Sequence, residues 1–200
     1  MDIVFSNNWN DTSVNINSYI YWGAATGPYS TKTELATSGA RGNSIADLNT
    51  DGYPDIVFSN YHNGSTRNIN SYIYWGASSG PYSTKTELAT IGATGNSIAD
   101  LNNDGYLDIV FSNNWNDTSG NINSYIYWGA ATGPYSTKTE LATSGAYGVS
   151  IAGSNIFGNE SGYTGNVIPL WATQGGYSWG LLTSPEYQLV AVKNEQLNSG

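Results

Sequence analysis

The sequence predicts an all-β fold, a β-propeller built from repeated four-stranded blades. The hexapeptide Asp-Ile-Val-Phe-Ser-Asn begins at Asp2, Asp55 and Asp108, so the repeated unit is 53 residues long (55 − 2 = 108 − 55 = 53). Each unit contains short segments rich in β-branched and aromatic residues, separated by turns of Gly, Asn and Pro. A repeat of about this length is typical of propeller blades, in which each sheet packs against its neighbours.

The middle unit shows the expected elements in order. A first strand, Asn43–Ala46, runs into an acidic loop and recurs at Asn96–Ala99. β-Branched and aromatic residues favour three further strands, at Asp55–Ser59, Ser71–Trp75 and Thr86–Thr90. We name the four strands of a unit A to D, and four strands match one blade. A β-solenoid is the alternative, although solenoid coils are usually shorter than this unit.

Composition excludes several classes of partner. The chain has 200 residues, which is room for about four blades. Its formal net charge of −9 argues against nucleic acid, which is bound mainly through Lys and Arg. The six basic residues are too scattered to form a patch for anionic lipid, and no apolar run approaches the ~20 residues of a membrane span. Without Cys, neither a disulfide nor a thiolate metal site is available.

The repeats extend over residues 1–153 and are followed by a diverged tail. The boundaries are expected at about 1–46, 47–99 and 100–153, with the tail at 154–200. Three strand-like runs in the tail fit a diverged fourth blade, at 167–171, 177–182 and 187–192. The alternative is a helix that begins at Ser184-Pro185-Glu186, because Ser is a common cap and Pro a common first helical residue.

The two ends of the repeat array are incomplete. The first unit lacks strand A, whereas Val149–Ala152 is a strand A without a blade of its own. Because an unpaired strand edge invites association, either this segment closes the ring within the chain or a homo-oligomer completes the propeller. Met1 lies inside a repeat with no signal peptide before it, so the sequence is expected to be trimmed from a longer one.

The strongest chemical signal is the acidic loop between strands A and B. It reads Asp47-Leu-Asn-Thr-Asp-Gly-Tyr-Pro-Asp55 and returns as Asp100-Leu-Asn-Asn-Asp-Gly-Tyr-Leu-Asp108. Alternate oxygen-bearing residues on a tight turn can converge on a hard cation such as Ca²⁺, as in the first part of an EF-hand loop. A plain Asn-Asp-Gly turn is the alternative. The predicted ligands are Asp47, Asn49, Asp51, Asp55, Asp100, Asn102, Asp104 and Asp108, with the backbone carbonyls of Tyr53 and Tyr106.

The motif Ile-Ala-Asp-Leu-Asn-x-Asp-Gly-Tyr-x-Asp-Ile-Val resembles the FG-GAP/VCBS repeat family, whose members are propeller blades with a calcium loop between their first two strands. The resemblance covers residues 1–153. It implies a secreted or cell-surface protein of adhesion or carbohydrate recognition, with calcium bound by the two acidic loops. Family propellers commonly have more blades than this chain can form. Asp2 keeps only the last ligand of its loop, and the fourth loop, Gly153–Ser161, has lost the acids at positions 1, 5 and 9.

The units differ mainly in the loop between strands B and C. The three versions are 8–14, 61–67 and 114–120, and the connection from D to the next A also varies, with Arg41, Thr94 and Tyr147 at one equivalent place. In a four-stranded meander these connections emerge on one face and the acidic loops on the other. Variable loops on a constant framework are typical of recognition, and drift in solvated loops is the alternative.

The residues of the variable loops suit a sugar ring. An exposed indole offers an apolar plane, and neighbouring amides and carboxylates can bond to hydroxyl groups. The predicted ligand-binding residues are Trp9, Asn10, Asp11, His62, Arg67, Trp115, Asn116 and Asp117. By contrast, Trp22, Trp75 and Trp128 each end a strand C and are expected to pack between blades.

No catalytic residues are predicted, so the chain is not expected to be an enzyme. It has one His, no Cys and no recognisable nucleophile–base pair, and carboxylates that ligate calcium are poor general bases. The sequence predicts an extracellular or cell-surface binding module that is stabilised by Ca²⁺ and recognises a glycan. The alternatives are a protein-binding adhesive segment of a surface protein and a non-catalytic accessory propeller of a polysaccharide-degrading enzyme.

Overall fold

Strands and turns make up the described part of the chain, as the sequence predicts. The computed structural model describes residues 1–23, 29–79, 81–132, 134–151, 177–180 and 190–193. These residues form no helix, and so they include no helix that could cross a membrane. The chain divides into two compact units, Met1–Ser150 and Ile151–Gly200.

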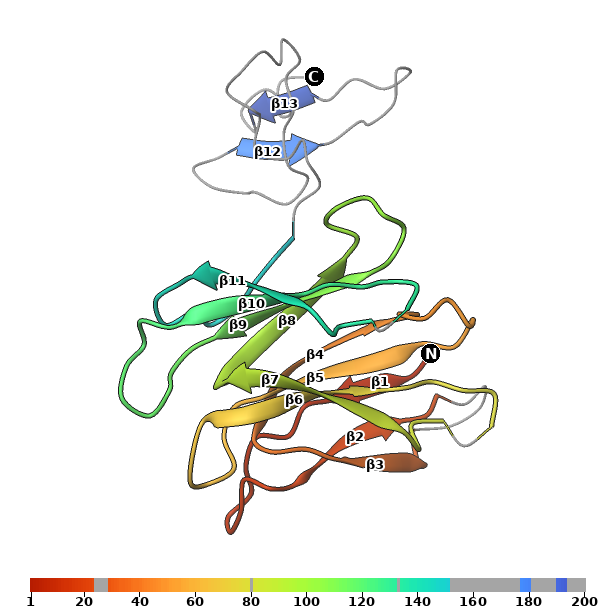
Figure 1. The fold of residues 1–200 in the computed structure, drawn as a ribbon. Helices are drawn as coiled ribbons and strands as arrows, with labels where there is room; N and C mark the ends of the chain where they lie inside the picture. Colours follow the sequence, from red (N-terminus) through yellow and green to blue (C-terminus); the bar gives the residue numbers. More distant parts are fainter. Residues whose placement is uncertain (24–28, 80, 133, 152–176, 181–189, 194–200) are drawn as a thin grey trace. The chain divides into compact units, whose positions relative to one another are not determined.

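Met1–Ser150 contains three antiparallel sheets, one for each repeat (Figure 1). Their orders are β1-β2-β3, β4-β5-β6-β7 and β11-β10-β9-β8, so neighbours in the sequence are neighbours in each sheet. The segments predicted as strands B, C and D of the middle unit are β5, β6 and β7, which confirms a repeated all-β fold. The bounds are β1 Ile3–Phe5, β2 Asn17–Tyr21, β3 Lys32–Ala36, β4 Ala40–Ala46, β5 Asp55–Asn60, β6 Asn68–Tyr74, β7 Lys85–Ile91, β8 Ala93–Ala99, β9 Asp108–Asn113, β10 Asn123–Tyr127 and β11 Lys138–Ala142.

The hydrophobic core lies between consecutive sheets. Phe58 packs with Ile20 and Leu35 of the first sheet, whereas its neighbour Val57 packs with Phe111 of the third. Successive residues of a strand point to opposite faces, so β5 contributes to both cores and is buried along its whole length. This two-sided burial explains why strand B reads as a continuous apolar run instead of an alternating one.

The strands A of the second and third units, β4 and β8, lie against each other at two glycines. A Cβ on Gly42 would come within 3.0 Å of Gly95 Cα, so a side chain at this place would push the strands apart. Ser44 Oγ donates a hydrogen bond to the Asn96 carbonyl, and Ser97 Oγ donates in the same way to the Val149 carbonyl. Val149 therefore takes the place of strand A in a next unit.

Ring closure stays a prediction. Within the described residues β1 pairs with β2 alone, and the segment from Val149 lies beside Ser97 of β8 instead of β1. Ala152, the last residue of the predicted closing segment, lies outside the described residues.

Two of the three tryptophans that end a strand C pack against the cores of the described residues, and Trp128 is in neither core cluster. Trp22 and Trp75 lie against the two core clusters, and the Trp22 ring is 6.3 Å from the Tyr82 ring of the next unit. Each of the three indoles donates Nε1–H to a Thr on strand D, and Trp128 bonds in this way to Thr139.

In Ile151–Gly200 the described strands are β12 (Tyr177–Gly180) and β13 (Val190–Lys193). They pair antiparallel, with Tyr177 opposite Lys193. Both overlap runs that the sequence predicts as strands. The run at 167–171 and the alternative helix start at Ser184 lie outside the described residues.

We predict that Phe58→Ala lowers the free energy of unfolding far more than Phe5→Ala. Phe58 is 0 % exposed between two sheets, whereas Phe5, at the same position of the first unit, is 49 % exposed. Creating a cavity at a buried Phe costs about 3–5 kcal/mol, and we expect less than about 1 kcal/mol at Phe5. Urea unfolding measures both. Equal losses of unfolding free energy in the two variants would show that Phe5, on the outer face of the first sheet, is covered as well as Phe58.

Candidate functional site

The acidic loop between β4 and β5 is folded around the Asp47 carboxylate. Asp47 Oδ1 accepts the backbone N–H of Asp51 at 3.1 Å, and Oδ2 accepts that of Gly52 at 2.8 Å. Asn49 Oδ1 also accepts the Asp51 N–H, and Asp51 Oδ1 accepts that of Tyr53. Gly52 has φ +87°, a conformation that glycine adopts without strain. The side-chain oxygens of Asp47, Asn49 and Asp51 therefore gather on one tight turn.

The loop between β8 and β9 repeats this geometry. Asp100 accepts the N–H groups of Asp104 and Gly105, Asn102 also accepts that of Asp104, and Asp104 accepts that of Tyr106. Gly105 again has a positive φ, of 89°. Two loops of the same construction follow from the same spacing of residues.

The last acid of each loop has a structural role that the sequence analysis missed. Asp55 is fully buried, and its two oxygens accept the N–H groups of Leu48 and Gly76 at 2.8 and 2.7 Å. Asp108 bonds in the same way to Leu101 and Gly129. These carboxylates tie the start of the acidic loop to the turn after strand C.

The signal for this role was present at the first copy. Asp2 keeps the position although the rest of its acidic loop is missing. Its Oδ1 still accepts the N–H of Gly23, which follows strand C of the first unit, at 2.8 Å. Because Asp2 is present although the rest of its acidic loop is missing, its position indicates a bond to the backbone of the sheet and not a role in the loop alone.

The loops offer the hard oxygen donors that calcium prefers, but not as a cluster of carboxylates alone. Among the described residues, no three His, Cys, Asp or Glu side chains are grouped so that they could hold a metal ion. Burial raises the pKa of Asp55; the N–H groups of Gly76 and Leu48 oppose this, and the charges of Asp51 and Asp47 add to it. Asp47 on the turn and Asp55 on β5 both accept backbone N–H groups with their two carboxylate oxygens, so calcium binding by the predicted ligands stays a prediction.

The variable loops between strands B and C are built alike, and an Asn closes each one. The Oδ1 atoms of Asn10, Asn63 and Asn116 accept the N–H groups two and three residues further along. These loops meet the D–A connections, because the Gly39 carbonyl accepts bonds from Asn8 Nδ2 and from the Tyr61 N–H. They lie at the strand ends remote from the acidic loops.

Two of the predicted ligand-binding residues project from these loops as exposed indoles. Trp9 is 61 % exposed and Trp115 is 39 % exposed. Asn10 and Asp11 are the next two residues after Trp9 in the sequence, and Asn116 follows Trp115. Because Oδ1 of each Asn is used within its own loop, the amide N–H groups are the part left for a ligand.

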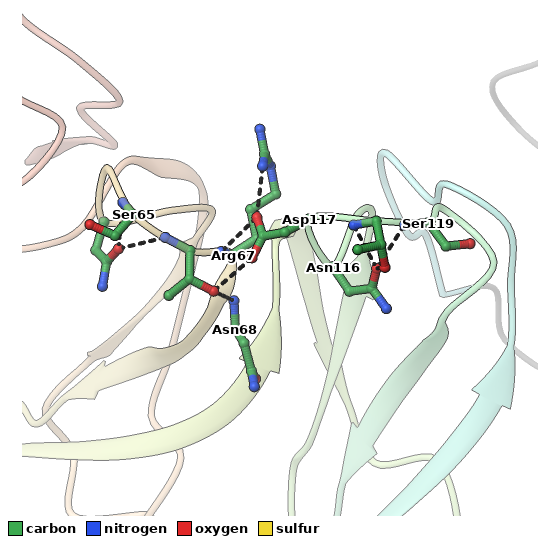
Figure 2. Close-up of polar contacts among 9 residues, drawn as sticks. Ser65, Arg67, Asn68, Asn116, Asp117 and Ser119 are labelled. Carbon is green, nitrogen blue, oxygen red and sulfur yellow. Dashed lines mark hydrogen bonds and ion pairs between the residues drawn. The ribbon is translucent and has the colours of Figure 1, made fainter.

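Two other predicted ligand-binding residues instead contact each other across the boundary between the second and third units (Figure 2). Asp117 Oδ1 pairs with Arg67 Nη1 at 2.8 Å, and its Oδ2 accepts the Thr66 hydroxyl at 2.7 Å. The Thr66 hydroxyl and the Arg67 N–H and guanidinium hold the pKa of Asp117 below its usual range. At the equivalent place between the first and second units, Val14 lies beside Gly64.

His62 lies next to Tyr61 in the middle loop. The two ring centroids are 5.3 Å apart and the rings meet edge to face. Burial lowers the pKa of His62, the charges of Arg67 and Arg41 lower it further, and Asp117 raises it. The sequence analysis did not single out Tyr61, one of 16 tyrosines in the chain.

A known family matches part of the repeat array. Residues 47–111 match the FG-GAP-like repeat family. The matched stretch contains both acidic loops and the whole of β5 to β8, so the resemblance inferred from the sequence is confirmed over this stretch. No curated protein and no solved structure matches the chain.

We predict that Asp55→Asn destabilises the protein in EDTA, where cation binding plays no part. The amide puts an N–H group against backbone donors that the carboxylate now accepts, and a buried donor without a partner costs about 1–3 kcal/mol. Asp51→Asn, on the exposed turn, is the matched control and should cost less than about 0.5 kcal/mol. Thermal unfolding measures both. Equal effects would contradict the anchoring role of Asp55.

Proposed function

We propose that this chain is a non-catalytic, extracellular binding module in which the repeats are β-propeller blades, calcium stabilises the acidic loops, and the variable face recognises carbohydrate. FG-GAP-like repeats support an adhesion- or binding-type module. The observation that carries the carbohydrate proposal is the exposure of Trp9 and Trp115 at the same position of two loops of the same construction.

Exposed indoles on loops that internal hydrogen bonds hold in shape favour a ligand with both apolar and polar faces. Trp22 and Trp75 lie against the protein core, whereas Trp9 and Trp115 leave large apolar surfaces in solvent. A sugar ring covers such a plane with its C–H groups and keeps its hydroxyl groups at the edge, within reach of Asn10 and Asn116. A flat protein ligand would gain less from two separate small planes.

Calcium is proposed because the chemistry of the acidic loops matches its preferences. Each turn presents carboxylate and amide oxygens, and the adjacent Asp55 or Asp108 adds a third negative charge to the same loop. Neighbouring carboxylates destabilise one another, and a divalent cation removes that repulsion. Asp47, Asn49 and Asp51 would hold the ion in the first loop, with the Tyr53 carbonyl as a further donor.

We predict that EDTA lowers the melting temperature of the native protein. A ligand that binds only the folded state adds RT ln(1 + [L]/Kd), which is about 2.7 kcal/mol at a hundredfold excess over Kd. Asp51→Ala combined with Asp104→Ala should remove the response to the chelator. Calorimetry in calcium and in EDTA checks this. Superimposable melting curves for the native protein would end the calcium proposal.

We predict that Trp9→Ala combined with Trp115→Ala abolishes binding on a glycan array in calcium buffer. An aromatic side chain at a binding surface typically contributes ~1–3 kcal/mol, so each loop should lose most of its affinity for a weakly bound sugar when its indole is removed. Tyr29→Ala, which removes an exposed aromatic from a C–D connection, is the control and should bind normally.

The double variant should melt at the same temperature as the native protein, because both indoles are exposed. Glycan binding that survives the double substitution would place the ligand elsewhere. A native protein that binds no glycan but captures a surface protein would favour the adhesive alternative.

A further inference from the structure

Four residues of the middle unit, which no other unit has at the same positions, come together on the variable face. Arg41 lies over the Tyr61 ring, with its guanidinium carbon 3.4 Å from the ring centroid, and the Arg67 guanidinium carbon is 5.1 Å from that centroid. The His62 ring meets the same tyrosine edge to face. The third unit has Thr94, Asn114, Trp115 and Gly120 at these four positions.

This cluster, Arg41, Tyr61, His62 and Arg67, concentrates positive charge on an acidic protein. It contains the only two arginines of a chain whose formal net charge is −9. Among the described residues, Lys32, Lys85 and Lys138 are each paired with a Glu, and Arg67 is paired with Asp117. Arg41 has no carboxylate partner among the residues whose side chains the structure describes.

The Arg41 guanidinium is held in place and its donors are free. Tyr61 is 8 % exposed, so its ring is a fixed surface for the guanidinium to stack on. No hydrogen bond from the Arg41 guanidinium to another described residue is formed. A planar guanidinium with free N–H groups matches the geometry of a carboxylate or sulfate, and its fixed position reduces the entropy lost on binding.

A second observation points to the same place. Arg67 Nε is buried and has no hydrogen-bond partner among the described residues, although its Nη1 is paired with Asp117. A buried Nε is closed to a ligand, so Arg67 supports the site through its charge and through the position that Asp117 and Tyr61 give it.

We propose that the middle unit binds an anionic saccharide, whose carboxylate or sulfate group is held by Arg41 above Tyr61 and beside His62. That the ligand is a saccharide rests on the proposed function. The new element is that this saccharide carries a negative charge. The net negative charge of the chain opposes long polyanions, so a single acidic group on a sugar fits this site better than a nucleic acid does.

The experiment compares matched charged and neutral probes on the whole 200-residue chain. Methyl glucuronide is paired with methyl glucoside, and galactose 6-sulfate is paired with galactose. Binding is followed by NMR on the imidazole of His62, the single histidine of the chain. We expect each effective charged probe to bind at least about tenfold more tightly than its neutral counterpart, as charge-assisted hydrogen bonds typically provide. Preference for the glucuronide alone identifies a carboxylate, and preference for the sulfate alone identifies a sulfate ester.

The test variant is Arg41→Thr, because Thr94 already occupies this position in the third unit. The control is Lys85→Thr, which removes the same charge from a Lys–Glu pair on β7. Arg41→Thr should lose the preference for the charged probe, and Lys85→Thr should keep it. An anion bound beside His62 should also raise the pKa of that imidazole, since it opposes the charges of Arg41 and Arg67 that lower it, while Asp117 is unchanged.

Equal binding of charged and neutral probes, or equal effects of the two variants, would overturn the inference. The proposed function fails independently. If binding at Trp9 and Trp115 is absent while the glucuronide still depends on Arg41, the proposed carbohydrate surface of the outer units is wrong and the anionic site stands. If glycans bind at the tryptophans without any dependence on Arg41, only this inference is wrong.

Discussion

The packing of each sheet against the next is the constraint on which the rest of the structure depends. A strand B such as β5 has apolar side chains on both faces, so a single unit cannot bury its own core. The two ends of the array show the consequence. Leu88 is 4 % exposed between the second and third sheets, whereas Leu141, its equivalent on the outer strand of the third sheet, is 43 % exposed. Stability therefore comes from having neighbours, and strand residues that face neighbours on both sides cannot vary.

That constraint leaves the loops as the place where the units can differ, and the two kinds of loop are used differently. At one end Asp2, Asp55 and Asp108 each bond to the N–H group that follows strand C, so this end is fixed in all three units. At the other end the same position between units is filled in two ways. Val14 lies beside Gly64 at the first boundary, and Arg67 pairs with Asp117 at the second. An apolar contact and an ion pair can replace each other there because neither enters the core.

The sequence predicted the period, the strands of the middle unit and the turn chemistry of the acidic loops, because these depend on local pattern. It did not predict that Asp117 would face Arg67, since that contact joins residues 50 positions apart and depends on how one unit lies on the next. It also assigned Asp55 only to the cation, because a spacing argument counts oxygens and does not see that Leu48 and Gly76 already donate to them. Tyr61 escaped notice because nothing in its local pattern distinguishes it from the strand tyrosines.

The distribution of cations explains why the middle unit is the one suited to a charged ligand. In the three repeat sheets Lys32, Lys85 and Lys138 each bond to the Glu two residues further along strand D, on the same face, so these charges are neutralised where they stand. Arg41 is on strand A, where no acid of the same strand lies two residues away, and it stacks instead on a buried ring. Stacking fixes the position of a guanidinium but leaves its charge in place. Among the three repeat sheets of Met1–Ser150, the middle one packs against a described sheet on each side, which supports the ring on which this charge is stacked.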